Sequence, residues 1–288
     1  MKPAPFDYHR AGSLSDAVAA LAGEPDAKVL AGGQSLVPLL SMRLASPTLL
    51  VDINAVPGLD TITAEERDDE DGGDRGVRVG ALARHAAVLA SAEVARVQPL
   101  VPMALAHVAH ATIRNRGTTV GSIVHADAAA EMPAVLALLG GTVEVEGPRG
   151  RRTIAAEELY VGPLETSLHH DEVAVSVTFP ALPAGAGTAF DEIARRHGDY
   201  AMAGVAAVVH GETVRAAYLS VNDVPTVVDL SGVDEEKLGE AALEHLEPVG
   251  DIHATADYRA QLVRVLTKRV VVAARADART RAATEEQK

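Results

Sequence analysis

Hydrophobic and polar positions alternate in blocks that predict short strands and helices. Near the N-terminus, apolar runs at residues 28–31 and 49–53 favour buried strands, and apolar positions at helical spacing over 36–44 lie between them. Strand, helix and strand joined by short links make a βαβ unit, which favours a parallel or mixed sheet. Residues 13–16 resemble a capping box and predict a helix that continues to residue 22.

The same reasoning assigns the later elements. Strands are expected at 76–81, 142–146, 151–154, 173–179, 190–196, 204–210 and 214–222, and helices at 84–91, 102–109, 128–139, 235–246 and 257–277. Residues 180–187 are rich in proline and glycine and are expected to be a linker. We therefore expect an α+β protein. Residues 1–179 would form one domain of two subdomains meeting near 55–60, and residues 188–288 a second domain with a three-stranded antiparallel sheet and helices.

Composition narrows the function. The chain has 288 residues, of which 48% are hydrophobic, and a net charge of -14, which argues against general binding to nucleic acid or anionic membranes. It has no cysteine, so it cannot itself hold an iron–sulfur cluster through thiolates. Basic residues interrupt the apolar runs, and no apolar signal core follows Met1, so we expect a cytoplasmic protein with no membrane span. The acidic run 65–74 is expected to be a solvated loop rather than a metal site.

Two distant stretches share one chemistry. Residues 31–35, Ala-Gly-Gly-Gln-Ser, lie between an expected strand and an expected helix, and residues 116–122, Arg-Gly-Thr-Thr-Val-Gly-Ser, are also rich in glycine and hydroxyl groups. Glycine lets the backbone approach a ligand closely, and the amides that open a helix suit phosphate. Each stretch alone could be a tight turn. Together they favour two sides of one pyrophosphate site.

Other chemistries fit less well. Neither Ser35 nor Ser122 lies in a Gly-x-Ser-x-Gly elbow, so a hydrolase is disfavoured although His125 and Asp127 follow Ser122. No Gly-x-Gly-x-x-Gly or Walker sequence follows an expected strand, so a bound dinucleotide would need another fold. His107 and His110 lack a nearby third ligand and are expected to be packing or surface residues.

At these positions the chain resembles a known family. Three stretches resemble motifs of the FAD-binding medium subunit of molybdenum hydroxylases, such as aerobic carbon monoxide dehydrogenase, and of the related flavin domain of xanthine dehydrogenase. They are residues 31–36, residues 113–118 with 121–122 and 125–127, and the Gly-Asp-Tyr-Ala of 198–201. The resemblance covers nearly the whole chain. Val120 stands where that family commonly has glycine, and because a β-branched residue disfavours positive φ, this loop is expected to hold its flavin differently or more weakly.

The resemblance implies a fold of the p-cresol-methylhydroxylase type that binds FAD. The pyrophosphate would lie between 31–35 and 118–122, Asp127 would face polar parts of the flavin, Tyr200 would lie near the isoalloxazine, and Arg195 or Arg196 would bring positive charge. It implies neither a catalytic residue nor a metal ligand in this chain. The implied FAD-binding residues are Leu30, Ala31, Gly32, Gly33, Gln34, Ser35, Leu36, Ile113, Gly117, Thr118, Thr119, Gly121, Ser122, Asp127, Arg196 and Tyr200.

The resemblance also implies a function. The chain would be the electron-relay subunit of a heterotrimeric oxidoreductase, assembled as a dimer of heterotrimers. A small subunit would carry two [2Fe-2S] clusters, and a large subunit with molybdopterin would hydroxylate the substrate. Two alternatives stay open: a stand-alone flavin oxidase or dehydrogenase acting on a small organic molecule, and a non-catalytic assembly protein on a flavoprotein scaffold.

Overall fold

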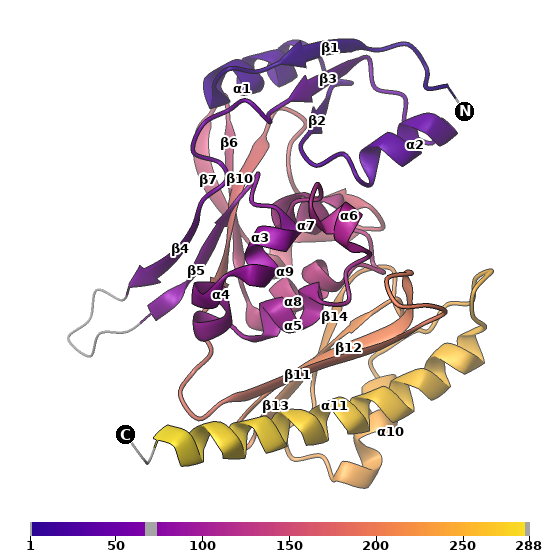
Figure 1. Ribbon diagram of the computed structural model, residues 1–288. Helices are drawn as coiled ribbons and strands as arrows, with labels where there is room; N and C mark the ends of the chain where they lie inside the picture. Colours follow the sequence, from indigo (N-terminus) through magenta and orange to yellow (C-terminus); the bar gives the residue numbers. More distant parts are fainter. Residues whose placement is uncertain (1, 67–73, 286–288) are drawn as a thin grey trace.

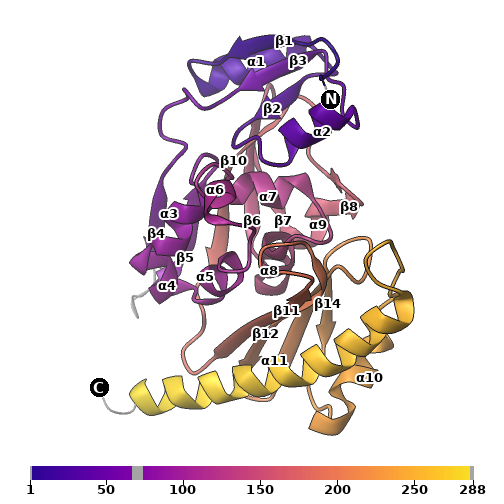
Figure 2. The same ribbon diagram turned by 45° about the vertical axis from the view of Figure 1, so that its right-hand side comes forward.

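The computed structural model describes residues 2–66 and 74–285. Most of the acidic run expected as a solvated loop, residues 67–73, lies outside these ranges. Three sheets follow one another along the long axis of the molecule, each built mainly from one part of the chain (Figures 1 and 2). Among the described residues, none of the helices is long and apolar enough to cross a membrane.

The N-terminal sheet is parallel and has the order β1-β3-β2. Its elements are β1 (Asp7–Arg10), α1 (Leu14–Gly23), β2 (Lys28–Leu30), α2 (Leu36–Met42) and β3 (Leu49–Asp52). The predicted βαβ unit is confirmed as β2-α2-β3. The exposed edge strand β1 was missed because its four residues, Asp-Tyr-His-Arg, show no hydrophobic period.

The predicted capping box is half present. The Ser13 hydroxyl accepts a hydrogen bond from the Asp16 amide at 3.1 Å, which caps α1. The Asp16 carboxylate, however, accepts from the amide of Gly12 at 2.9 Å and not from that of Ser13.

The middle sheet is antiparallel with the order β4-β5-β10-β6-β7. Its strands are β4 (Ile62–Glu66), β5 (Asp74–Gly80), β6 (Thr142–Gly147), β7 (Gly150–Ala155) and β10 (Val173–Pro180), and β6 and β7 form the predicted hairpin. A two-stranded ladder, β8 (Tyr160–Gly162) with β9 (Glu165–Thr166), follows. The helices of this part are α3 (His85–Ala90), α4 (Ala92–Val97), α5 (Leu100–Leu105), α6 (Ala111–Arg114), α7 (Thr119–His125), α8 (Glu131–Leu139) and α9 (Ala156–Leu159).

The third sheet has four strands where three were predicted. Its strands are β11 (Gly187–Ala194), β12 (Ala201–His210), β13 (Thr213–Leu219) and β14 (Thr226–Asp229), followed by η1 (Glu235–Lys237), α10 (Leu238–Leu243) and α11 (Ala256–Glu285). The short β14 escaped prediction because its pattern spans only four residues after a proline. The long α11 runs beneath the sheet on the face opposite the middle part of the chain (Figure 1).

Hydrophobic contacts are continuous between the middle and C-terminal parts. One buried cluster runs from Ala11 to Leu219 and includes Ala206 and Ala217 of the third sheet, while a second cluster lies between that sheet and α11. Residues 181–186 connect β10 to β11. The division into domains at 180–187 stays a prediction.

Two predicted boundaries near the candidate site are wrong. The helix expected at 128–139 begins only at Glu131, and a separate helix, α7, occupies 119–125, where a glycine-rich loop had been expected to continue. The strand expected at 190–196 ends at Ala194, so Arg195 and Arg196 lie in the turn before β12. In both places the local run of small or charged residues does not indicate where the helix or strand ends. Tertiary packing sets these ends.

Candidate functional site

The two glycine-rich stretches touch one another. A Cβ placed on Gly32 would lie 2.8 Å from the Cα of Gly117 and would collide with the carbonyl oxygen of Arg116. Gly32 therefore serves close approach between two segments that are 85 residues apart (117 minus 32). The predicted pairing of the two stretches is present in the geometry.

The first stretch presents a row of unpaired amides. Ser35 precedes α2 and makes no side-chain capping bond, and Gly33 turns the chain with a φ of +71°. Within the described part of the chain, no acceptor meets the N–H groups of residues 32–36, whereas the amide of Val37 already bonds to the Gly33 carbonyl at 3.0 Å. Such partly exposed donors suit the oxygens of a phosphate or pyrophosphate.

The second stretch is the first turn of α7. Thr118 caps this helix, since its hydroxyl accepts from the Gly121 amide at 3.1 Å. Beneath it, Thr119 Oγ1 lies 3.2 Å from Nδ1 of the buried His85. Burial, followed by the charge of Arg114, lowers the pKa of His85 to about 4, so a neutral imidazole supports the loop.

Val120 does not need the positive φ on which the expectation for it depended. It lies in the first turn of α7, its side chain is buried, and it does not have a positive φ. A β-branched residue is tolerated there because the position is helical and faces the core. The backbone reason for that expectation is therefore absent, and a different or weaker hold on the flavin stays a prediction.

A polar bridge that sequence reasoning missed joins the two stretches. Asn54 Nδ2 donates to the Ala31 carbonyl at 2.8 Å, and Arg84 donates to Asn54 Oδ1 at 2.7 Å and to the Arg116 carbonyl at 2.8 Å. Asp52 Oδ1 holds Asn54 in place, because it accepts from the Asn54 backbone amide at 2.8 Å and from Asn54 Nδ2 at 2.6 Å. The signal in the sequence was Asp52-Ile53-Asn54 at the carboxyl end of a strand, because the carboxyl ends of adjacent parallel strands lie at one edge of a sheet.

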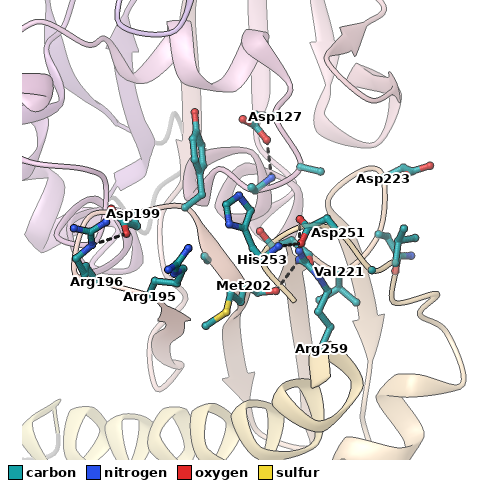
Figure 3. Close-up of a pocket in the computed structure, with 18 of the residues that line it drawn as sticks. Asp127, Arg195, Arg196, Asp199, Met202, Val221, Asp223, Asp251, His253 and Arg259 are labelled. Atoms are coloured by element: carbon teal, nitrogen blue, oxygen red, sulfur yellow. Dashed lines mark hydrogen bonds and ion pairs between the residues drawn. The ribbon is translucent and has the colours of Figure 1, made fainter. Parts of the chain in front are cut away.

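The helix α7 leads from this pair of loops toward a cavity. Its seven residues cover about 10 Å at 1.5 Å per residue, and the turn after it contains Asp127. The cavity has a volume of about 680 Å³ and lies between that turn and the C-terminal part of the chain. Figure 3 shows Asp127 on one wall and Arg195, Arg196 and Asp199 on another.

The predicted site residues thus fall into two groups. Residues 30–36 and 117–122 form the paired loops, and Ile113 supports them because its carbonyl accepts from the Gly117 amide at 2.7 Å. Asp127, Arg196 and Tyr200 line the cavity instead. Arg196 is paired with Asp199 at 3.3 Å, and Tyr200 as a whole residue is 66% exposed.

The far wall of the cavity contains a buried guanidinium that sequence reasoning also missed. Arg259 of α11 donates to the Met202 carbonyl at 2.7 Å, to the Ser220 carbonyl and to Asp251 at 2.6 Å (Figure 3). Burial opposes ionisation of Asp251, but amide hydrogen bonds and Arg259 outweigh it and lower its pKa to about 2. This charge pair fixes the loop that closes one end of the cavity.

The paired loops and the adjoining cavity define a dinucleotide-binding protein outside the Rossmann class. The family model described as "FAD binding domain in molybdopterin dehydrogenase" matches residues 4–182, and the chain belongs to this family.

Three similar proteins illustrate the family. The chain is 42% identical to the 6-hydroxypseudooxynicotine dehydrogenase complex subunit alpha of Paenarthrobacter nicotinovorans, over 95% of this chain and 96% of that protein. It is 40% identical to the nicotine 6-hydroxylase medium subunit of the same organism, over 95% and 99%. The structure of carbon monoxide dehydrogenase from Hydrogenophaga pseudoflava includes a chain that matches with a TM-score of 0.88 and 33% identity, over 96% of this chain and 99% of that one.

These similarities confirm the resemblance stated from the motifs and the α+β fold that it implied. The residues present also fit the cofactor. Several hydrogen-bond donors can bind a pyrophosphate without a full countercharge. The unpaired amides of residues 32–36 and the hydroxyls of Ser35 and Ser122 supply such donors. The roles of individual residues stay predictions.

Proposed function

We propose that this chain is the FAD-binding medium subunit of a multi-subunit molybdenum hydroxylase and passes electrons from an iron–sulfur partner to an external acceptor. The contact of Gly32 with residues 116–117, beside a row of unpaired amides, is the observation that carries the proposal. When bound, FAD supplies the ability to exchange electrons singly or in pairs. The protein supplies the binding and the electrostatic setting.

In this proposal residues 31–35 and 118–122 would hold the pyrophosphate between them. Asp127 and Tyr200 would hold the isoalloxazine end of the molecule in the cavity. About 10 Å of helix separates the loops from the cavity. This separation supports both placements, because FAD is an extended molecule. Arg196, already paired with Asp199, would contribute only a screened positive charge.

The partners follow from the chemistry. The chain has no cysteine, so iron–sulfur clusters must lie on another subunit. Relatives named medium subunit and complex subunit support partner subunits, and the family description names a molybdopterin dehydrogenase. In this proposal a small partner would carry two [2Fe-2S] clusters and a large partner would carry molybdopterin. We propose a dimer of such heterotrimers in the cytoplasm. The substrate pocket would lie on the large subunit.

The first experiment is to purify the chain and measure its flavin. The proposal predicts about one FAD per chain, identified by chromatography after denaturation, or stoichiometric uptake of added FAD. It also predicts no oxidation of N-heterocycles or aldehydes by the chain alone. Turnover without partners would favour a stand-alone dehydrogenase, and failure to bind FAD would refute the proposal. Stable partner binding without FAD would favour an assembly protein.

A further inference from the structure

Behind the cavity wall lies a group of buried acids that the proposed FAD contacts do not use. Glu131, the first residue of α8, is 9% exposed, and the side chain of Glu192 on β11 is 4% exposed. Glu192 Oε1 lies 3.5 Å from Nδ1 of His107, which follows α5. Within the described residues, no hydrogen-bond partner meets the buried Oε2 of Glu192.

The burial of these acids affects the pKa values of Glu131 and His107. Burial and then the charge of Glu192 raise the pKa of Glu131 to about 8, because two carboxylates in a poorly solvated region cannot both ionise without a large cost. The pKa of His107 is raised chiefly by its hydrogen bond to Glu192. Near neutral pH Glu131 is therefore neutral, and the raised pKa of His107 favours the protonated imidazole 3.5 Å from Glu192.

This cluster is coupled to the cavity. Asp127 lines the cavity and its charge acts on Glu131, while partial enclosure and the charges of Asp127 and Glu131 raise the pKa of the Tyr200 phenol. At the other end, the His107 side chain is 30% exposed and gives the cluster access to solvent. The charged or aromatic groups facing the cluster are Asp127, Tyr200, Asp191, Phe190 and His197.

We propose that Glu131, Glu192 and His107 form a proton-uptake cluster that compensates the negative charge arriving in the cavity when the bound cofactor is reduced. This inference rests on the proposed placement of FAD. The electrons come from the iron–sulfur partner, or from dithionite in an assay. A proton from solvent forms an O–H bond on the Glu131 carboxylate, and His107 is the solvent-exposed end of the cluster. No residue of the cluster is oxidised or reduced.

The direction of the pH effect follows. Below about pH 8 Glu131 already holds its proton, so added negative charge changes its protonation little. Above that pH Glu131 is ionised in the resting protein. Negative charge in the cavity then raises its pKa further, and the carboxylate takes up a proton. The cluster therefore adds proton uptake on the alkaline side only.

The test measures protons taken up per flavin reduced. The FAD-loaded chain is reduced with dithionite in weak buffer containing a pH indicator, at about pH 6.5 and about pH 9. The variants are Glu131→Gln and Glu192→Gln, and the control is Glu212→Gln in the exposed turn before β13. FAD content is measured first for every protein. The infrared band of a protonated carboxyl group near neutral pH is recorded on the FAD-free proteins.

The wild type and Glu212→Gln should take up as much as about one proton more per flavin than Glu131→Gln at pH 9, with no difference at pH 6.5. The infrared band should be absent only in Glu131→Gln. Should that variant bind FAD poorly, Glu192→Gln should lower the pH at which uptake by Glu131 begins, because it removes a charge that raises the pKa of Glu131. Equal uptake by all FAD-loaded proteins would overturn the cluster while leaving FAD binding intact. A wild type without FAD would overturn the proposed function and the cluster with it.

Discussion

Replacing Gly32 with alanine tests the meeting of the two loops. The new methyl group would lie 2.8 Å from the Cα of Gly117, and it would also press on the Arg116 carbonyl, which Arg84 holds at 2.8 Å. Carbon atoms normally approach to about 3.5–4.0 Å, so the loops must separate by about 1 Å. Backbone atoms cannot turn aside as a flexible side chain can.

The cost can be estimated from overpacking elsewhere, which is about 1–3 kcal/mol. If this cost falls on the closed, ligand-bound arrangement, the Kd for FAD should rise about 5- to 150-fold. Part of the cost also falls on the ligand-free fold, because the two loops are in contact there, and a thermal melt measures that part. Gly33 is a less clean position, since its φ of +71° strains any side chain irrespective of the ligand.

The assay is a fluorescence titration of FAD-free protein with FAD, together with a thermal melt. Gly23→Ala is the matched control, because a Cβ at this position in α1 meets nothing within 4 Å. It should bind FAD as the wild type does. Equal Kd values for wild type and Gly32→Ala would refute the idea that the two loops close on one pyrophosphate.

Three further predictions concern the bridge, the cavity and the buried acid. Arg84→Lys should raise the Kd for FAD about 10-fold, because one ammonium group cannot reproduce both guanidinium bonds to Asn54 and the Arg116 carbonyl; an unchanged Kd would dismiss the bridge. Tyr200→Ala should weaken FAD about 3- to 10-fold and alter the flavin absorption spectrum through lost ring contact, with little change in melting temperature; an identical spectrum would remove Tyr200 from the flavin ring. Glu131 binds a proton in the folded chain up to about pH 8 and in the unfolded chain only to about pH 4.5, so wild-type stability should fall as pH rises through that window, by as much as about 5 kcal/mol, and urea denaturation of Glu131→Gln should show a flatter dependence; parallel curves would contradict the raised pKa.

The sequence predicted the structure well where the hydrophobic period was clear and where loops were rich in glycine and hydroxyl residues. The βαβ unit around Gly32 was predictable because apolar strands flank an amphipathic helix, and the second loop was recognisable from its run of small hydroxyl residues. Their contact was inferred from shared chemistry alone. Only the structure shows that Gly32 packs against residues 116–117.

What could not be predicted depends on tertiary placement. Asn54 and Arg84 are ordinary polar residues in the sequence, and they become a bridge because the ends of β2 and β3 lie together near the start of α3. Glu131 looked like a helix residue, and its burial comes from packing of α8 against the third sheet. Helix α7 was taken for loop because glycine and β-branched residues lower helix propensity, which the Thr118 cap and the core overcome.

The most direct measurement is a crystal structure of the chain with bound FAD. The account predicts that the pyrophosphate oxygens accept hydrogen bonds from the N–H groups of residues 32–36 and approach the first turn of α7, with the isoalloxazine in the cavity beside Tyr200. A pyrophosphate lying away from both loops, or a flavin ring outside the cavity, would contradict it.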